Sequence, residues 1–272
     1  MTTVVIYVTV RAELFDRQKR GHEVLELNKL RGSLRVSRRG ATVTSWKVRG
    51  VDVLFPEDDT HLVGGEPKRR GGIPICFPNF GPTPKGTRLN QHGFLRDATM
   101  DVYVNGRPVL ALEETADTLD VYPYQFQVAV ECVFVSESGF RHRMQITNTE
   151  RRVLLPIGPA LHPYFRTPEG TAKVIWADGE MVVDKPAIDA VQVHTNGNVV
   201  RIEIPGIGQV WIDSLDYNIN GSGLDFVVWR DSAEYICVEP ITSTPGKMAK
   251  VLTPGESRML TVEFLLVAPR RS

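Results

Sequence analysis

Apolar and polar residues alternate along much of this chain, and the clearest example lies near its middle. Apolar side chains occupy every second position from Tyr124 to Phe134. A period of two places them on one face of a long, half-buried β-strand. After a turn at 136–139 the alternation resumes from Phe140 to Asn148, so the two segments predict a β-hairpin. The second strand carries polar residues on both faces, which indicates a sheet face open to water or to a ligand.

The other strand candidates are short and closely separated by turns. Gly and Pro, with 23 and 18 residues, supply the turns that an all-β fold needs, and Pro254-Gly255-Glu256 is one of them. Residues 11–27 give the best helical pattern, and it is weak. We therefore predict an all-β fold, a large antiparallel β-sandwich. Its further strand candidates are 43–48, 51–54, 174–175, 199–204, 210–212, 226–229, 235–238 and 260–267.

No linker, composition break or internal repeat divides the chain, so we expect one domain over residues 1–272. Residues 1–10 are apolar but lack the basic start and the cleavage site of a signal peptide, and they predict a strand instead. No window approaches the roughly 18 apolar residues of a spanning helix. These features predict a protein without a membrane partner.

The charges of the chain cancel, with 32 Lys and Arg against 32 Asp and Glu. Neutrality argues against a nucleic-acid partner, because such partners are held by strong electrostatic attraction. The cysteines, Cys76, Cys132 and Cys237, are widely spaced and form neither a disulfide framework nor a zinc motif. We expect a cytoplasmic protein that acts on a small molecule as a monomer or weak homo-oligomer.

The segment 64–96 interrupts the alternation and is rich in Gly, Pro and aromatic residues. A compact domain rarely keeps so long an irregular loop without a function, although a well-packed surface crossing is the alternative. Its first motif runs Arg69-Arg70-Gly71-Gly72-Ile73-Pro74 and continues to Cys76-Phe77-Pro78. Paired glycines let a backbone approach a ligand closely, and an arginine offers a planar fork of donors. Its second motif is Gln91-His92-Gly93-Phe94, followed by Arg96.

Two further motifs lie downstream. Leu161-His162-Pro163-Tyr164-Phe165 holds a histidine between apolar neighbours, and Glu239 closes the apolar run 235–238 just before Pro240. A carboxylate at the end of an apolar run is partly desolvated, which raises its pKa towards that of a general base. Taken singly, such a histidine is more often structural, and such a glutamate is as often an exposed strand end.

Together and in this order, the four motifs resemble the aldose 1-epimerase (mutarotase) superfamily. The most similar branch is that of the glucose-6-phosphate 1-epimerases, or hexose-6-phosphate mutarotases. The resemblance extends from about Asn28 to the C-terminus, while residues 1–27 match poorly and are interpreted as an extension or an edge strand. It implies the large antiparallel supersandwich of galactose mutarotase-like proteins, which agrees with the period-two pattern.

The resemblance also implies roles for individual residues. It makes His162 the general acid and Glu239 the general base of sugar ring opening, with His92 assisting at the ring. It makes Arg70, Gln91 and Arg96 substrate-binding residues, and it implies neither a metal nor an organic cofactor. Among the nearby aromatic residues, we expect Tyr164 to line the site and Phe77, Phe80 and Trp229 to pack in the core.

The chain departs from the phosphate-specific branch in two places. The branch has an Asp-Arg-Val-Tyr-like segment after the catalytic histidine, whereas residues 198–211 offer no Asp in register. Its Trp-Asn-Pro-Trp run is replaced by Val228-Trp229-Arg230-Asp231. The substrate is therefore left open between an aldohexose and its 6-phosphate, and a phosphate would need Arg70 and Arg96 as a clamp.

Three other functions remain as alternatives. The chain would be a non-catalytic carbohydrate-binding protein if it kept the pocket without the chemistry. A glycosidase would need a second carboxyl group facing Glu239, for which Asp213 and Asp216 are the candidates. A cupin-like metal enzyme would use His61, His92 and His162, which lack the close spacing of metal ligands.

Overall fold

The computed structural model describes residues 24–57, 62–63, 66–105, 107–215 and 225–267. Within these ranges almost all regular structure is β-strand, and every named strand pair is antiparallel. The helical elements are one α-helix, α1 (Ala116–Val121), and one 3-10 turn, η1 (Leu95–Asp97). This confirms the predicted all-β class. None of the described helices is long and apolar enough to cross a membrane.

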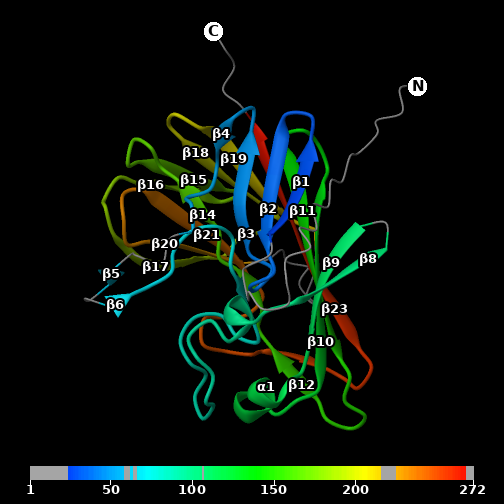
Figure 1. Cartoon of the computed structure of the whole chain (residues 1–272). Helices are drawn as coiled ribbons and strands as arrows, with labels where there is room; N and C mark the ends of the chain where they lie inside the picture. The colour runs from blue at the N-terminus through cyan, green and yellow to red at the C-terminus, as the bar shows by residue number, and fades with distance from the viewer. Residues whose placement is uncertain (1–23, 58–61, 64–65, 106, 216–224, 268–272) are drawn as a thin grey trace.

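The largest sheet has nine strands in the order β16-β15-β18-β19-β23-β11-β10-β9-β8 (Figure 1). In chain order its strands are β8 (Asp101–Asn105), β9 (Arg107–Glu113), β10 (Phe126–Phe134), β11 (Gly139–Asn148), β15 (Ala172–Trp176), β16 (Gly179–Val183), β18 (Val199–Ile204), β19 (Gly208–Ser214) and β23 (Ser257–Val267).

The predicted hairpin lies at the centre of this sheet. β10 pairs with β11, with Phe134 opposite Phe140 and Phe126 opposite Asn148, which confirms the prediction. The strand begins at Phe126 rather than at Tyr124. Pro123 has no N–H to donate to a neighbouring strand. The Tyr124 N–H donates to the Tyr122 carbonyl at 2.8 Å instead of to a neighbouring strand.

The expectation of an open sheet face is wrong for the inward face of β11, because its polar residues are buried there. The Asn148 side-chain amide donates to the Val153 and Leu252 carbonyls, both at 2.9 Å. His142 is also fully buried, and neither of its ring nitrogens has a hydrogen-bond partner among the described residues. The opposite face of β11, with Arg141 and Gln145, is half-buried to exposed.

Two smaller sheets face the nine-stranded sheet. The first has the order β1-β2-β3-β4 and the second the order β17-β20-β21-β13-β7, with β14 also paired to β21. Their strands are β1 (Val24–Lys29), β2 (Gly32–Ser37), β3 (Val43–Val48), β4 (Val51–Asp52), β7 (Ile75–Cys76), β13 (Ala160–Leu161), β14 (Tyr164–Arg166), β17 (Ile188–Val193), β20 (Asp225–Arg230) and β21 (Tyr235–Ile241). Two isolated pairs remain, β5 (Leu62–Val63) with β6 (Glu66–Pro67), and β12 (Leu155–Ile157) with β22 (Lys250–Leu252).

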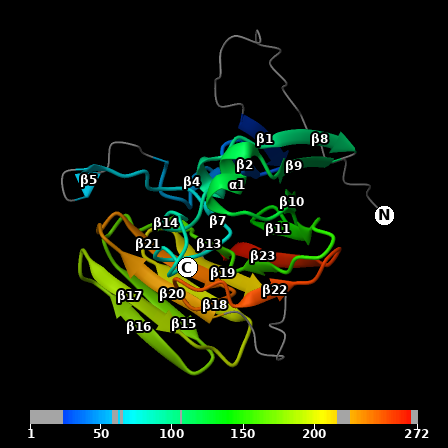
Figure 2. The ribbon, with the colours of Figure 1, turned by 90° about the horizontal axis from the view of Figure 1, so that it is seen from below.

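Aromatic contacts join these layers into one core. The Trp46 ring of β3 packs edge-on against Phe140 of β11, with ring centroids 5.2 Å apart. From the six-stranded sheet, Phe165 of β14 lies 6.3 Å from Phe264 of β23. Figure 2 shows β13, β20 and β21 alongside the layer that contains β18, β19 and β23. The architecture is therefore a sandwich of one large sheet and two smaller ones.

Residues 1–23 lie outside the described part of the chain, so the strand expected at 1–10 and most of the helical candidate at 11–27 are not described. The end of that candidate is strand and not helix, because Val24–Lys29 forms β1 at the edge of the four-stranded sheet. Leu25 and Leu27 alternate towards the core, as a strand requires.

The buried His142 makes a prediction about acid stability. Burial lowers its pKa from 6.5 to about 4, because the imidazolium would lose its hydration. Between these values the unfolded chain binds the proton more readily, so the free energy of unfolding should fall as the pH falls. This residue contributes up to ~1.4 kcal/mol per pH unit. Urea unfolding of His142→Leu at several pH values should give a shallower dependence than the wild type, and parallel curves would contradict this account.

Candidate active site

A cavity of about 630 Å³ lies over the outer face of the six-stranded sheet. Strand β21 supplies one wall and is buried on both faces. Its Ile236 and Val238 join the main core, while Tyr235 and Cys237 pack in a separate cluster on the other side. Glu239, two positions beyond Cys237, therefore points to that side. The cavity is lined by each of the predicted site residues, which are Arg70, Gln91, His92, Arg96, His162, Tyr164 and Glu239.

His162 and Glu239 form a buried pair at the base of the cavity. His162 lies between β13 and β14, where its backbone N–H donates to the Pro74 carbonyl at 2.9 Å. Its Nε2 is 3.5 Å from Oε1 of Glu239, and the two side chains are only 6% and 2% exposed. Nδ1 of His162 and Oε2 of Glu239 are buried and have no hydrogen-bond partner among the described residues. These free atoms leave the pair able to contact a ligand.

Burial acts on both members of this pair. It raises the pKa of Glu239 well above its usual value, with Arg70 opposing the shift. It lowers the pKa of His162 well below 6.5, and the neighbouring His92 ring and the charges of Arg96 and Arg70 disfavour the imidazolium form further. Both pKa shifts favour the uncharged forms of Glu239 and His162, because a buried charge loses its hydration. Burial thus shifts the pair towards a neutral imidazole on His162 and a protonated carboxyl on Glu239.

His92 is held in one tautomer. The Gly81 N–H donates to its Nδ1 at 3.2 Å, and the Cys76 sulfur lies 3.4 Å from the same nitrogen. A nitrogen that accepts a backbone N–H carries no proton itself, so the neutral ring carries it on Nε2. Burial, then the charges of Arg96 and Arg70, lower the pKa of His92 to about 3. His92 is thus a neutral hydrogen-bond donor, with its ring centroid 5.1 Å from that of His162.

The irregular segment reaches the cavity through a tight turn at Gly93. Its φ is +72°, and a Cβ there would lie 2.0 Å from the Phe77 carbonyl oxygen. The glycine pair of the first motif serves a different purpose from the one expected. A Cβ on Gly71 would lie 2.1 Å from the Pro56 oxygen, and one on Gly72 would lie 2.6 Å from the Val43 oxygen. The close approach is therefore to protein backbone and not to a ligand.

Arg70 is already engaged by protein groups. Its Nη2 donates to Oδ2 of Asp231 at 2.8 Å, and its guanidinium lies 5.2 Å from the centre of the Trp229 ring. The Tyr235 hydroxyl donates to the other oxygen of Asp231. Both carboxylate oxygens of Asp231 are thus occupied, and the charge of Arg70 is balanced.

The remaining basic residues around the cavity divide into paired and unpaired ones. Arg39 and Arg69 both contact Oδ1 of Asp97, at 3.0 and 2.7 Å. Arg96 has no carboxylate partner within the described residues, and its Nη2 reaches the Arg69 carbonyl at 3.5 Å. Lys68 is exposed and likewise has no acidic partner in the described part of the chain. Positive charge without a protein counter-ion is therefore centred on Arg96 and Lys68.

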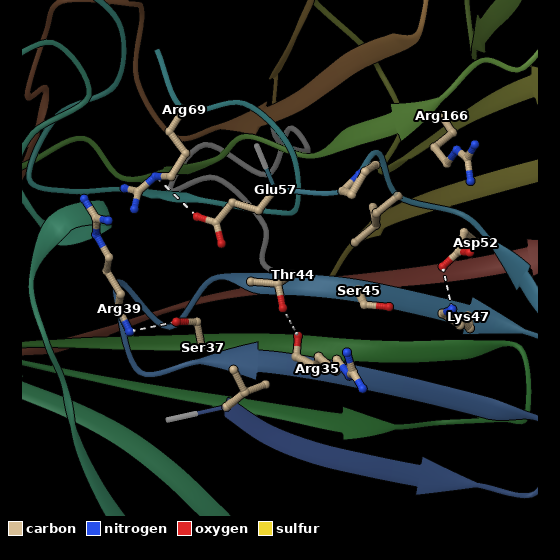
Figure 3. Close-up of a pocket in the computed structure, with 13 residues that line it drawn as sticks. Arg35, Ser37, Arg39, Thr44, Ser45, Lys47, Asp52, Glu57, Arg69 and Arg166 are labelled. Carbon is tan, nitrogen blue, oxygen red and sulfur yellow. Dashed lines mark hydrogen bonds and ion pairs between the residues drawn. The ribbon is translucent and has the colours of Figure 1, made fainter. Parts of the chain in front are cut away.

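A second pocket, of about 590 Å³, opens beside this cavity and shares Arg39 and Arg69 with it (Figure 3). Its carboxylates are in ion pairs, Glu57 with Arg69 and Asp52 with Lys47, each at 3.3 Å. It contains no histidine and no unpaired acid. We therefore place the chemistry in the cavity of the buried pair, although the two pockets are similar in volume.

Sequence reasoning missed several residues that line the cavity. Phe77 is in the main core as expected. Phe80 is buried in a smaller core cluster with Trp229 packed against it, and both side chains also line the cavity. Asp231 was also missed. It comes shortly after the apolar run 226–229, just past the end of β20, and an acidic residue after an apolar run is the signal that identified Glu239.

Among the described residues that the alternative functions require, His92 lies beside His162, whereas Asp213 lies in β19 of the large sheet and does not line the cavity. Asp216 and His61 lie outside the described residues. Asp231 does share the cavity with Glu239, but its two oxygens are held by Arg70 and Tyr235.

The fold is thus an antiparallel sandwich with a cavity over one of its smaller sheets. A sequence profile of one family, described as "Aldose 1-epimerase", matches residues 23–243. The chain therefore belongs to the aldose 1-epimerase family, as the four motifs predicted.

Individual relatives agree with this assignment. The chain is 32% identical over 142 residues to a protein from Cenchrus ciliaris described as "Putative glucose-6-phosphate 1-epimerase". That match covers 46% of this chain and 41% of the relative, so less than half of the relative is matched.

Solved structures share the fold at low sequence identity. The Slr1438 protein of Synechocystis sp. PCC 6803 superposes with a TM-score of 0.74 at 22% identity, over 92% of this chain and 97% of that one. A galactose mutarotase-like protein of Lactobacillus casei superposes with a TM-score of 0.68 at 18% identity. The match covers 90% of this chain and 100% of that one. These likenesses confirm the galactose mutarotase-like fold.

The turn at Gly93 can be tested by a pair of glycine substitutions. Gly86 has a similar φ of +80° but nothing within 4 Å of an added Cβ. Gly86→Ala should cost about 1–2 kcal/mol, for the left-handed backbone alone. Gly93→Ala should cost at least ~2 kcal/mol more, because the new carbon must displace the Phe77 carbonyl. Denaturant unfolding measures both, and equal losses would show that the close approach does not limit this turn.

Proposed function

We propose that this protein is a mutarotase that interconverts the α and β anomers of an aldohexose, with a hexose 6-phosphate as its preferred substrate. The single observation that carries the proposal is the buried His162–Glu239 pair, at 3.5 Å, in the wall of a polar cavity. Family membership supports the reaction class. The name of the Cenchrus relative supports the phosphorylated substrate.

The pair matches the proton requirement of mutarotation. Ring opening needs a proton on the ring oxygen while another leaves the anomeric hydroxyl. The C1–C2 bond then turns, and closure on the other carbonyl face inverts C1. In our proposal the proton of the pair moves to His162 when sugar binds, His162 protonates the ring oxygen, and Glu239 accepts the hydroxyl proton. Closure reverses both transfers, so one proton held by the pair is sufficient and no other reactant is consumed.

The neighbouring residues would hold the sugar in place. His92 would donate from Nε2 to a ring substituent, since its Nδ1 is already occupied. Arg70 would approach the sugar with its position fixed by Asp231, and Gln91 offers an amide on the cavity wall. Trp229 and Tyr164 would pack on apolar sugar faces.

The phosphate would bind at Arg96 together with Lys68. This revises the clamp of Arg70 and Arg96 expected from the sequence, because Asp231 already balances Arg70. An anion gains most from cations that have no counter-ion of their own. Arg96 is such a cation, and Lys68 adds a second charge at the rim.

Loss of either member of the pair should abolish the reaction. In Glu239→Gln and His162→Ala we expect anomer exchange, followed by NMR, to slow by roughly 10²–10⁴-fold for each lost proton transfer. The pH profile of the wild-type rate should show no His162 inflection near 6.5, because burial lowers the pKa of this residue well below that value. Folded variants that exchange anomers at the wild-type rate would refute the assignment. Sugar binding without exchange by the wild type would favour the non-catalytic alternative.

Arg96 should determine the preference for phosphate. Arg96→Ala should lower kcat/KM for glucose 6-phosphate relative to glucose by on the order of 10–100-fold, the worth of a charge-assisted hydrogen bond. Arg88→Ala serves as the control, because Arg88 pairs with Asp120 at 2.9 Å and does not line the cavity. An unchanged ratio in Arg96→Ala would reject the phosphate site.

A further inference from the structure

Cys237 lies close to both members of the buried pair, although the proposed proton transfers do not use it. Its sulfur, a His162 ring nitrogen and a Glu239 carboxylate oxygen all lie within 4.8 Å of one another. This is the one group of at least three His, Cys, Asp or Glu side chains suited to a metal ion in the described part of the chain. Each of the three residues is buried.

The fold brings the three together through one strand pair. Cys237 and Glu239 are two positions apart in β21, so their side chains lie on the same face. Tyr164 of β14 stands opposite Cys237, and His162 precedes Tyr164 by two residues. The His162 ring stacks on Tyr164, with centroids 4.7 Å apart and planes 8° from parallel. This packing fixes the imidazole beside the thiol.

The donor set is one that zinc prefers. Zinc binds imidazole nitrogen, thiolate sulfur and carboxylate oxygen at about 2.0–2.3 Å, in tetrahedral geometry. These lengths place the nitrogen and oxygen ligands about 3.4 Å apart, and the sulfur and oxygen about 3.6 Å apart. The His162 Nε2 and Glu239 Oε1 are already 3.5 Å apart. The three ligand atoms lie within 4.8 Å of one another. The Cys237 sulfur therefore needs to move by at most about 1 Å to reach the separation that zinc requires.

The other ring nitrogen of His162, Nδ1, and the other carboxylate oxygen of Glu239, Oε2, which do not form the 3.5 Å contact, are also buried without a hydrogen-bond partner among the described residues. Mg²⁺ and Ca²⁺ prefer an all-oxygen shell, so the nitrogen and sulfur donors select a softer ion.

We propose that His162, Cys237 and Glu239 bind one Zn²⁺ ion and leave its fourth position open to the cavity. His162 and Glu239 line the cavity while Cys237 lies behind them, so the ion would enter past the pair. Zinc bound there would occupy both proton-transfer groups, and it would therefore be an inhibitor and not a cofactor. The inhibition rests on the proposed function, whereas the binding does not.

Zinc binding by the metal-free full chain tests the site. In competition with a chromophoric chelator, the wild type should bind one Zn²⁺, and Cys237→Ser should weaken binding by about 100-fold or more, since even outer-shell partners are worth 10–100-fold. Cys132→Ser is the matched control, because Cys132 is a buried cysteine of β10 that does not line the cavity. With Co²⁺, a thiolate charge-transfer band should appear in the wild type and in Cys132→Ser, and be absent from Cys237→Ser.

Several results would overturn the site. These are no zinc binding by the folded wild type, equal binding by Cys237→Ser, or a cobalt spectrum without a thiolate band. Cys237→Ala replaces the serine variant if the latter does not fold. Zinc at a concentration that saturates the wild type should stop anomer exchange by the wild type but not by Cys237→Ser. Unchanged exchange by the zinc-treated wild type would also contradict the site. Zinc binding through Cys237 in a protein without exchange activity would refute the proposed function and leave the site standing.

Discussion

Strand β21 is buried on both of its faces, and this constraint determines where the reactive groups lie. Its alternate residues Ile236 and Val238 anchor it in the main core. The strand cannot shift by one residue without burying Glu239 in that core. Glu239 and Cys237 are consequently fixed on the cavity side, in a region with too little water to favour a carboxylate. The charge of Arg70 opposes this effect of burial only in part, so the pKa of Glu239 stays raised.

The irregular segment depends on the same sheet for its position. A backbone bond from His162 N to Pro74 O, at 2.9 Å, ties it to the sheet, and a bond from Phe94 N to Phe77 O, also at 2.9 Å, holds it together internally. These bonds hold His92 close to His162 without a regular element. The segment also brings four cations to the cavity, where Asp97 pairs with Arg69 and Asp231 pairs with Arg70. The charges of Arg96 and Lys68 are left for a ligand.

Much of the fold follows from alternation in the sequence. The long hairpin of β10 and β11 was predicted because its apolar positions repeat without interruption, and its observed register confirms that prediction. The helical pattern at 11–27 was misleading at its end, where Val24–Lys29 forms the edge strand β1, one of the two interpretations given to residues 1–27. The open face predicted for β11 was wrong, since a buried His142 or Asn148 has the same sequence signature as an exposed one.

The candidate site was predicted through its motifs, and the structure brings the motif residues to one cavity. Contacts between distant segments could not be predicted from the sequence, because no local pattern links Arg70 to Asp231 or shows that Gly71 lies against Pro56. The nearness of Cys237 to His162 is likewise a consequence of strand pairing and not of sequence spacing. Contacts between residues of two distant segments could therefore be identified only from the folded structure.

The protonation of Glu239 in the sugar-free protein is the most direct test of this account. Its central claim is that burial favours the uncharged pair, with the proton on the Glu239 carboxyl. Difference infrared spectroscopy of the wild type against Glu239→Gln should reveal a protonated carboxylic acid that is absent from the variant. A carboxylate band in its place, with His162 in the imidazolium form, would contradict the account.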